Sequence, residues 1–406
     1  METGISKERA IALICEKTKV SGTEYISARD ASGRVLAEDV IALSDQPPWP
    51  RSPLDGYALR SCDTKGAVRE HPLRFRIIDT IYAGSWSEKR VGEMEAVRLM
   101  TGAPIPQGCD CVIRQEETVH EADTVEIAAE LHPWENYCFA GEDFARGDVI
   151  LPKGTRLCGN ALGVLSSAGM YREDMVLPVY GKIRCALFCT GDELVPNSVR
   201  PLPKGKIYSG NEALLVSRLE DLGIEISSCR GYFGDDPEAL ASSVKEALAS
   251  ADAVITTGGV SVGVKDILHE TLDLLEAERV FWRVKLKPGT PLMFSMYHGK
   301  PILSLSGNPF AASATFELFA RPMLARLTGA EDLLPLITPA VLSDPFMVFG
   351  KVPRYVRAVF HDGCVSFPTG HSSGMLSSSV NTNCLAELPP RDHPFERGET
   401  VKVYLL

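Results

Sequence analysis

The spacing of apolar residues changes along the chain and predicts two kinds of architecture. Between residues 181 and 328, short apolar runs rich in β-branched residues alternate with amphipathic segments of about 12 residues. The runs predict strands at 182–190, 224–233, 253–255, 281–285 and 301–307. The amphipathic segments predict helices at 211–222, 237–250, 266–276 and 309–328. Strands that alternate with helices in this way form a doubly wound parallel sheet.

Two other regions have the pattern typical of small β domains. From residue 54 to about residue 127, short strands follow one another, and Leu73, Phe75 and Ile77 alternate with Arg74 and Arg76. The chain after residue 338 is again rich in strands and turns. Four prolines between residues 45 and 53 exclude helix and central strand, and they indicate a rigid connection between domains. The predicted fold class is therefore multidomain, α/β plus β.

The length and net charge of the chain limit the kinds of molecule that it is expected to bind. The chain has 406 residues and a net charge of −11, which disfavours nucleic acid as the main ligand because phosphate binding requires a basic surface. No apolar run approaches the roughly 18–20 residues of a membrane helix. The N-terminus lacks the layout of a signal peptide. We therefore expect a cytoplasmic protein without nucleic-acid or membrane contacts.

The 11 cysteines are scattered and form no recognisable framework. Close pairs are Cys109 with Cys111 and Cys185 with Cys189, each within an apolar run. Neither pair has a matched second pair at zinc-finger spacing. Buried free thiols in a reducing cytosol are therefore the better interpretation.

A glycine-rich turn follows the strand at 253–255. Gly258, Gly259, Ser261 and Gly263 let backbone N–H groups approach an anion, and the helix that begins near Asp266 adds positive partial charge. Ligands of parallel sheets bind at the carboxyl ends of strands, where this turn lies. The turn is therefore either a phosphate or oxyanion site or a tight turn that binds nothing.

Three acidic residues are predicted at one edge of the same sheet. Glu193, Asp235 and Asp266 each follow a predicted strand or its turn, so their carboxylates are expected to converge. Clustered carboxylates bind a hard cation such as Mg²⁺, and we predict that these three residues are its ligands. In the alternative interpretation, Asp235 and Asp266 are N-caps of the helices that follow them.

Basic residues and a second turn are predicted at this edge as well. Arg283, Lys285 and Lys287 suit a phosphate or oxyanion, although they also fit a solvated basic face. A further strand-to-helix turn either binds an anion or caps a helix, and it consists of Ser306, Gly307, Asn308 and Pro309.

Ordered motifs across nearly the whole chain resemble those of one protein family. In chain order they read SPLDGYAL, MTGAPIPQGCDCVI, AGEDFARGDVILPKGTRL, TGDEL, TTGGVSVGVKDIL, LKPGTP and SGNPFAAS, followed by SSGMLSSSVNTNCLAELP. Motifs in one fixed order are far more specific than any one of them. The sequence resembles the molybdopterin molybdenumtransferases, the MoeA family, to which the E domain of gephyrin belongs.

The resemblance implies an elongated homodimer of four-domain subunits. A discontinuous linker and dimerisation domain is expected at residues 1–45 with 147–178, and a small β domain at 46–146. An α/β molybdopterin-binding domain is expected at 179–328 and a C-terminal β domain at 329–406. The cleft would lie between the α/β domain of one subunit and the small β domain of its partner.

The resemblance also implies a reaction. Molybdate would be inserted into adenylylated molybdopterin, with Mg²⁺-dependent cleavage of the adenylate, release of AMP and formation of molybdenum cofactor. A molybdopterin adenylyltransferase and client molybdoenzymes are the implied partners.

Site residues follow from the motifs that match. Asp55 and Thr101 would come from the small β domain, and Asp143 lies in the Gly-Glu-Asp motif. Ser378, in the last domain, matches a serine placed near the oxyanion. The residues implied along the α/β edge are Glu193, Asp235, Asp266, Arg283 and Lys287.

Four positions depart from the usual family motifs. Ser306 replaces the first proline of PGNP, Arg283 stands where lysine is frequent, Ser209 replaces the aspartate of IYDSN, and Pro53 replaces the alanine of SAMDGY. These departures leave molybdate and tungstate open as the inserted oxyanion. A pterin-binding scaffold without turnover and a nucleotide phosphohydrolase are the alternatives to a transferase.

Overall fold

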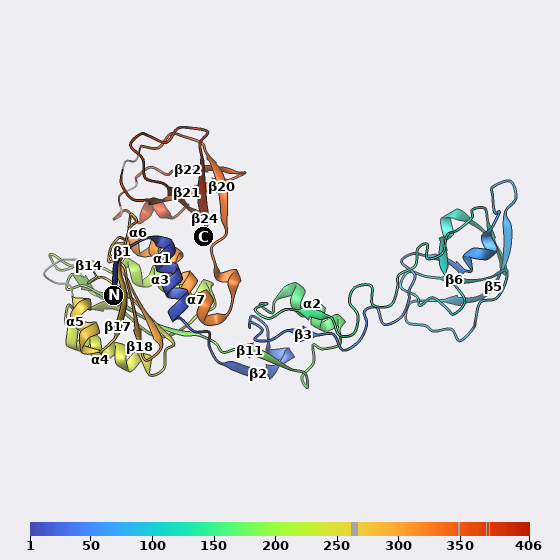
Figure 1. Ribbon diagram of the computed structural model, residues 1–406, viewed down its shortest axis with the longest axis horizontal. Coiled ribbons are helices and arrows are strands. Elements are labelled where there is room, and N and C mark those ends of the chain that lie inside the picture. The colour runs from blue at the N-terminus through green and yellow to red at the C-terminus, as the bar shows by residue number, and fades with distance from the viewer. Residues whose placement is uncertain (261–266, 348–349, 371, 373) are drawn as a thin grey trace.

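The computed structural model describes residues 1–260, 267–347, 350–370, 372 and 374–406. Figure 1 shows an elongated molecule, with an α/β body and a β-barrel at one end, a small β domain at the other end, and a linker between them. The elongated multidomain α/β plus β architecture predicted from the sequence is therefore confirmed.

The α/β body is built on a seven-stranded sheet in the order β1-β17-β18-β19-β16-β12-β15. Its strands are β1 (Glu2–Ile5), β12 (Arg184–Thr190), β15 (Glu225–Phe233), β16 (Ala253–Thr257), β17 (Glu278–Val284), β18 (Met293–Tyr297) and β19 (Lys300–Leu305). The sheet is mixed rather than fully parallel, because β18 runs antiparallel to both β17 and β19. His298 and Gly299 join β18 to β19, and both have positive φ, which is typical of a two-residue hairpin turn.

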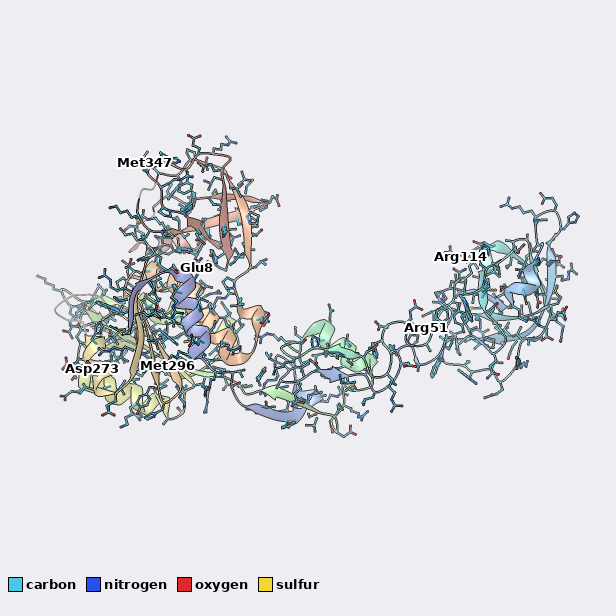
Figure 2. All side chains as sticks on the ribbon, viewed as in Figure 1. Glu8, Arg51, Arg114, Asp273, Met296 and Met347 are labelled. Carbon is cyan, nitrogen blue, oxygen red and sulfur yellow. The ribbon has the colours of Figure 1, made fainter. Side chains whose placement is uncertain are left out.

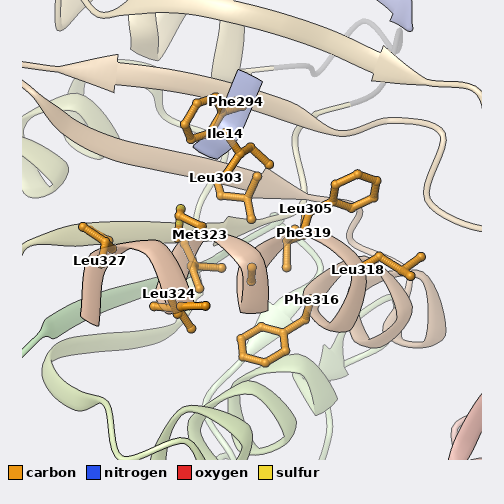
Figure 3. Close-up of a cluster of buried hydrophobic side chains, with 14 of the residues drawn as sticks. Ile14, Phe294, Leu303, Leu305, Phe316, Leu318, Phe319, Met323, Leu324 and Leu327 are labelled. Atoms are coloured by element: carbon orange, nitrogen blue, oxygen red, sulfur yellow. The ribbon is translucent and has the colours of Figure 1, made fainter. Parts of the chain in front are cut away.

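Helices cover both faces of this sheet. One face carries α1 (Lys7–Lys17), α3 (Gly210–Asp221), α6 (Pro309–Thr315) and α7 (Arg321–Thr328), and the other carries α4 (Pro237–Leu248) and α5 (Ile267–Leu274). Burial on both sides explains the continuous apolar run of β12, in which Leu187 packs on the first face and Phe188 on the second. Figure 3 shows the first face, where Leu303 lies close to Met323 and Ile14.

The predicted helix at 309–328 contains a π-helical turn, Phe316–Ala320, between α6 and α7. Glu317 in this turn is 2% exposed, and its carboxylate pairs with Arg218 of α3 at 2.8 Å and with Arg321 at 3.0 Å. A buried carboxylate requires such partners, so the turn is held by a contact between helices.

The N-terminal strand and helix lie in the α/β body, whereas the predicted division placed residues 1–45 with the linker domain. β1 pairs in parallel with β17, with Ile5 opposite Val284. α1 buries Ala10 and Ile14 in the core of the body. The sequence pattern did not reveal this pairing, because Thr3 and its partner Trp282 are 279 positions apart.

The remaining strands form the linker and the two β domains. The linker contains β2 (Thr23–Ser27), β3 (Val40–Ile41), β10 (Val149–Leu151), β11 (Val176–Tyr180) and α2 (Gly159–Ser167). The small β domain contains β4 (Gly56–Leu59), β5 (Leu73–Ile81), β6 (Glu95–Leu99), β7 (Cys111–Arg114), β8 (Thr118–Glu121) and β9 (Thr124–Ile127). The closed C-terminal barrel contains β20 (Ile337–Leu342), β21 (Arg354–His361), β22 (Cys364–Ser366), β23 (Cys384–Leu388) and β24 (Thr400–Leu405). The short strands β13 (Leu194–Val195) and β14 (Ile207–Tyr208) pair beside the main sheet.

The cysteines are as predicted from the sequence. All 11 are free thiols, and Cys109, Cys111, Cys185 and Cys189 are buried. Across the part of the chain that the structure describes, the helices are too short or too polar to cross a membrane.

Candidate active site

A pocket of about 360 Å³ lies at the carboxyl edge of the main sheet. It is bordered by the segments that follow β12, β15, β16 and β19 and by the start of α3. The predicted site residues that line it are Glu193, Asp235, Gly258, Gly259, Gly307 and Pro309. Their convergence at one edge agrees with the expectation for strands that end on the same side of a sheet. We call it the acidic pocket.

Close packing constrains the glycines in the two turns that border the acidic pocket. Gly258 has φ of +93°, and a Cβ atom there would lie 2.3 Å from the carbonyl oxygen of Thr190. A Cβ atom on Gly307 would lie 3.2 Å from the Cα atom of Gly258. The Gly258 N–H donates to the carbonyl of Leu305 at 3.2 Å. This close packing explains both glycines whether or not an anion binds, so both interpretations of the turn remain open.

A reciprocal contact between two aspartates positions the acid after β15. The Asp235 N–H donates to Asp192 Oδ1 at 3.0 Å, and the Asp192 N–H donates to Asp235 Oδ2 at 3.4 Å. The N-cap of α4 is Asp236, whose side chain accepts from the N–H of Ala239 at 3.0 Å. The alternative that Asp235 is the N-cap is therefore wrong. Asp192 was missed, although it stands in the TGDEL motif beside Glu193.

The charge of the acidic pocket fits a hard cation. Among its described lining residues, the charged side chains are those of Glu193 and Asp235. Carboxylates repel phosphate unless a cation lies between them, and Mg²⁺ prefers such oxygen donors. Within the described residues, no group of three or more His, Cys, Asp and Glu side chains is close enough to hold a metal ion. The predicted third ligand, Asp266, lies outside the described residues, as do Ser261 and Gly263.

Two further residues complete the wall beside α3. The Asn211 side chain is 6% exposed, and its Nδ2 donates to the carbonyl of Gly307 at 2.9 Å and to Thr257 Oγ1 at 3.3 Å. Ser209 caps α3 by accepting from the Glu212 N–H at 3.4 Å. The serine therefore retains a capping role where the family usually has aspartate. Asn211 was not predicted, although it ends the IYSGN stretch that was compared with the family motif.

A second pocket, of about 380 Å³, lies between the α/β body and the C-terminal barrel. The charged side chains among its described lining residues are Lys287, Arg354 and Arg357, and we call it the cationic pocket. Lys287 lines this pocket. It does not line the acidic pocket, which contains Glu193 and Asp235. The two pockets flank the start of α6, since Pro309 lines the acidic one and the next residue, Phe310, lines the cationic one.

Backbone hydrogen bonds between domains place Lys287 opposite the barrel. The Lys287 N–H donates to the carbonyl of Pro353 at 3.0 Å, and the Tyr355 N–H donates to the carbonyl of Lys287 at 2.7 Å. These bonds make a parallel bridge between Lys287 and Arg354. The cationic pocket is therefore made by two domains that are joined at this bridge.

Arg357 is the most deeply buried charge of the cationic pocket. Its residue is 1% exposed, and its guanidinium lies 4.0 Å from the centre of the Phe310 ring. It donates to the carbonyl of Ser372 at 2.6 Å, to Ser379 Oγ at 2.9 Å and to the carbonyl of Met375. Burial lowers the pKa of Arg357 from its ordinary value. Within the described residues it has no carboxylate partner, so a bound anion would offset the cost of burying this charge. This arginine was not predicted, although the alternation of a strand places it on the same face as buried Tyr355.

Three predicted residues of the α/β body and the barrel border neither pocket in the described chain. Arg283 is exposed, has φ of +65°, and its guanidinium lies 5.6 Å from the Trp282 ring. Asn308 is the N-cap residue of α6. Ser378 donates through Oγ to the carbonyl of Met375 at 3.1 Å, in the same short turn as Ser379, which contacts Arg357. Ser378 is therefore near the cationic pocket without lining it.

Asp55 and Thr101 lie together in the small β domain. The N–H and Oγ1 of Thr101 donate to Asp55 Oδ1 at 2.7 and 2.8 Å, and these two bonds hold the pKa of Asp55 below its ordinary value. Figure 2 labels Arg114, which pairs with Gly56 next to Asp55, at the opposite end of the molecule from Met296 of the α/β body. Within one chain, Asp55 and Thr101 are thus separated from both pockets.

Asp143 lies near the connection between the linker and the small β domain. Its N–H donates to the carbonyl of Gln46 at 2.9 Å, beside the proline-rich segment. One chain therefore does not bring Asp143 to the acidic or the cationic pocket.

Comparison with known proteins covers almost the whole chain. Residues 5–169 match the model of the MoeA N-terminal region (domain I and II), residues 186–326 that of a probable molybdopterin binding domain, and residues 339–406 that of the MoeA C-terminal region (domain IV). A molybdopterin molybdenumtransferase of Staphylococcus aureus is 36% identical over 406 residues, which cover 99% of this chain and 95% of that protein. The corresponding protein of Staphylococcus epidermidis is 34% identical over 409 residues, again with 99% of this chain covered and 96% of the relative.

A solved structure supports the same similarity. The crystal structure of a molybdopterin biosynthesis moeA protein from Pyrococcus horikoshii OT3 superposes with a TM-score of 0.85 at 28% identity. The match covers 99% of this chain and 100% of that chain.

Proposed function

Because the chain belongs to the MoeA family of molybdopterin molybdenumtransferases, which act in molybdenum cofactor biosynthesis, we propose that it inserts molybdate into adenylylated molybdopterin with Mg²⁺-dependent release of AMP. The observation that supports this reaction is the pair of oppositely charged pockets on either side of the α6 N-terminus. One suits a metal-bound phosphate and the other suits a free oxyanion.

In the acidic pocket, Glu193 and Asp235 would hold Mg²⁺, with Asp192 orienting Asp235 through the reciprocal hydrogen bonds. The bound ion would offset the charge of the substrate phosphates and polarise the phosphoanhydride. The side chains themselves fix the position of the adenylate end of the substrate. This arrangement requires the cation to bind before or together with the anionic substrate.

In the cationic pocket, Lys287, Arg354 and Arg357 would hold molybdate. Arginine presents a planar fork of N–H donors that matches an oxyanion, and lysine adds a compact positive charge. Arg357 is preorganised by its contacts with Ser372, Ser379 and Phe310, so little reorganisation is needed when the anion enters. The gain in rate would come from positioning the two substrates next to each other.

We further propose a cytoplasmic homodimer in which each site is completed by the partner subunit. The support is the separation of Asp55 and Thr101 from both pockets of their own chain, together with the family resemblance. Asp143 would be brought to the site in the same way. A molybdopterin adenylyltransferase and client molybdoenzymes are the proposed partners.

The reaction is tested by incubating the purified protein with adenylylated molybdopterin and molybdate and measuring the release of AMP and cofactor. Chelating Mg²⁺ should stop AMP release, and Asp235→Asn should slow it by about 100-fold or more. Lys287→Ala should raise the KM for molybdate by about 10-fold, since it removes one charge-assisted contact. Its melting temperature should stay close to that of the wild type, because the side chain is exposed.

Lys285→Ala is the matched control for Lys287→Ala. Lys285 is also exposed and lies two positions away, but it lines neither described pocket. Equal effects of the two substitutions would show that general positive charge, and not the cationic pocket, attracts the oxyanion. Pterin binding without AMP release in the presence of Mg²⁺ would instead favour a scaffold function.

A further inference from the structure

Lys7, the first residue of α1, connects the α/β body to the C-terminal barrel. Its side chain is 12% exposed, and its Nζ lies 3.1 Å from Glu387 Oε2 and 2.5 Å from Tyr404 OH. The Tyr404 hydroxyl in turn donates to Glu387 Oε2 at 2.6 Å. Figure 2 labels the neighbouring Glu8 on α1, close to the barrel. A lysine, a tyrosine and a carboxylate thus form one closed set of contacts between two domains.

Aromatic rings enclose the same ammonium group. Its Nζ lies 4.9 Å from the centre of the Tyr404 ring and 5.3 Å from that of the Tyr355 ring. The two rings pack edge to face, with centres 5.8 Å apart. Burial on its own lowers the pKa of Lys7, but the tyrosine hydroxyls and the Glu387 carboxylate outweigh it and the pKa is raised. Lys7 is therefore charged at neutral pH.

On the α/β side, Lys7 is tied to the segment that carries Lys287. Ile5, two residues before Lys7, pairs with Val284, and its carbonyl accepts from the Lys285 N–H at 2.8 Å. A displacement of the α1 N-terminus would therefore also displace the LKPGTP turn, which carries Lys287.

On the barrel side, the partners of Lys7 lie on the barrel face that packs on the α/β body, and this face also carries Arg357. Tyr355 on β21 stands between Arg354 and Arg357 in the chain and is opposite Glu387 on β23. Tyr404 lies on the next strand, β24, opposite Leu385. Lys7 thus holds β23 and β24, whereas the backbone bridge at Lys287 holds the start of β21.

We propose that Lys7 is a positioning residue for the cationic pocket, fixing the angle of the barrel so that Arg354 and Arg357 face Lys287 across the domain boundary. This inference rests on the proposed oxyanion function of that pocket. The bridge between Lys287 and Arg354 holds the start of β21, and Leu385 of the barrel packs into the core of the α/β body. Lys7 adds charged contacts away from the bridge, on β23 and β24, so that the angle of the barrel is fixed at a second place. Positioning of this kind matters because small displacements of binding groups weaken oxyanion contacts strongly.

The test measures binding of molybdate alone to the full-length protein by calorimetry, together with the KM for molybdate and kcat for AMP release. Lys7→Met keeps the unbranched shape of the side chain, one atom shorter, and removes its charge. We expect the Kd and KM for molybdate to rise by about 10-fold, while kcat at saturating molybdate changes less than about twofold. Lys7→Arg, which keeps the charge, should restore most of the affinity. A folding defect alone would not raise the KM for molybdate while leaving kcat nearly unchanged.

Lys17→Met is the matched control. Lys17 is the last residue of the same helix, and its Nζ lies 2.6 Å from Glu278 of β17, a contact that does not involve the barrel. Its substitution should leave the Kd for molybdate unchanged. If Lys17→Met and Lys7→Met weaken binding equally, the effect comes from the helix and the proposal is wrong.

Two further variants keep the outcome interpretable. If Lys7→Met folds poorly because Glu387 is left without its cation, Lys7→Met combined with Glu387→Gln should fold and still bind molybdate weakly. Arg357→Leu should abolish molybdate binding. Unchanged binding in Arg357→Leu would refute the oxyanion pocket itself, whereas loss there with wild-type affinity in Lys7→Met would refute only the role of Lys7.

Discussion

Burial has opposite consequences for the charged and the nucleophilic side chains of this protein. Arg357 keeps its charge in a nearly closed environment because carbonyl and hydroxyl oxygens and the Phe310 ring surround it. Buried cysteine thiols remain neutral, since burial penalises the charged thiolate. Burial raises the pKa of Cys109, Cys185 and Cys384 to about 12 each. At the scale of residues, the buried guanidinium is therefore available for an ionic ligand, and the buried thiols are protected from reaction.

Alkylation should separate these thiols into two groups. In the native protein at pH 8, iodoacetamide should modify exposed Cys62, Cys158 and Cys364 and spare Cys109 and Cys185. A thiol with pKa of about 12 is ionised to about one part in ten thousand at pH 8, and only the thiolate reacts. Mass spectrometry of the digested protein gives the extent of labelling at each position. Labelling of Cys185 as fast as Cys62 in folded protein would contradict the structure, and labelling of all sites in guanidinium is the control.

The raised pKa values of the buried thiols also make the stability of the protein depend on pH in the alkaline range. The pKa of each buried thiol in the folded state, about 12, exceeds its ordinary value of 9.0. Unfolding therefore releases protons above pH 9, so the stabilisation from burying these neutral thiols is complete below pH 9 and is lost as the pH rises through 12.

At the scale of elements, the acidic pocket depends on two glycine turns that touch each other. The turn after β16 and the turn after β19 approach closely at Gly258 and Gly307, and Asn211 of α3 bonds to the second of them. The carboxylates come from other segments, after β12 and β15. A change in the turns should therefore alter the pocket without removing any of its charged groups.

Gly258→Ala should disrupt the acidic pocket and destabilise the α/β body. The added Cβ atom would lie 2.3 Å from the Thr190 carbonyl oxygen, and φ of +93° is unfavourable for alanine. We expect a loss of about 2–4 kcal/mol in the free energy of unfolding in urea, together with loss of AMP release.

Gly299→Ala is the control for this substitution. Gly299 also has positive φ, at +81°, but a Cβ atom there meets no atom within 4 Å. Gly299→Ala should lower the free energy of unfolding only by the backbone strain, about 1–2 kcal/mol, and activity should be retained. Equal costs for the two variants would show that strain, and not the contact with β12, makes Gly258 necessary.

At the scale of the whole molecule, the elongated shape places possible site residues at both ends of one chain. Asp55 and Thr101 lie in the small β domain, and Glu193 and Asp235 lie in the α/β body (Figures 1 and 2). A shared site in a symmetric dimer would join the two sets.

Mixed dimers test this arrangement directly. Asp55→Asn and Asp235→Asn should each inactivate the homodimer. When the two variants are co-expressed with different tags and purified as mixed dimers, one of the two shared sites contains both substitutions and the other contains neither. The mixed dimer should then have about half the activity of the wild type. Activity no higher than that of the single variants would place each site within one chain.

The sequence by itself determined the kinds of element and the chemistry at the edge of the sheet. Periodicity predicted the α/β body, the β domains and the helices, because burial of one or both faces of an element is recorded in neighbouring residues. The ends of β12 and β15 placed Glu193 and Asp235 together for the same reason, since strand direction follows from the alternation of strands and helices. The ordered motifs identified the family.

Only the tertiary structure decided which distant segments face each other. The pairing of β1 with β17, the antiparallel direction of β18 and the buried partners of Glu317 depend on contacts between segments far apart in the sequence. The same is true of Lys287, which faces Arg354 and Arg357 of the barrel and not the acids of its own sheet. Local pattern records whether a side chain is buried or exposed, but the partner it meets is set by the packing of whole domains, which no short stretch of sequence contains.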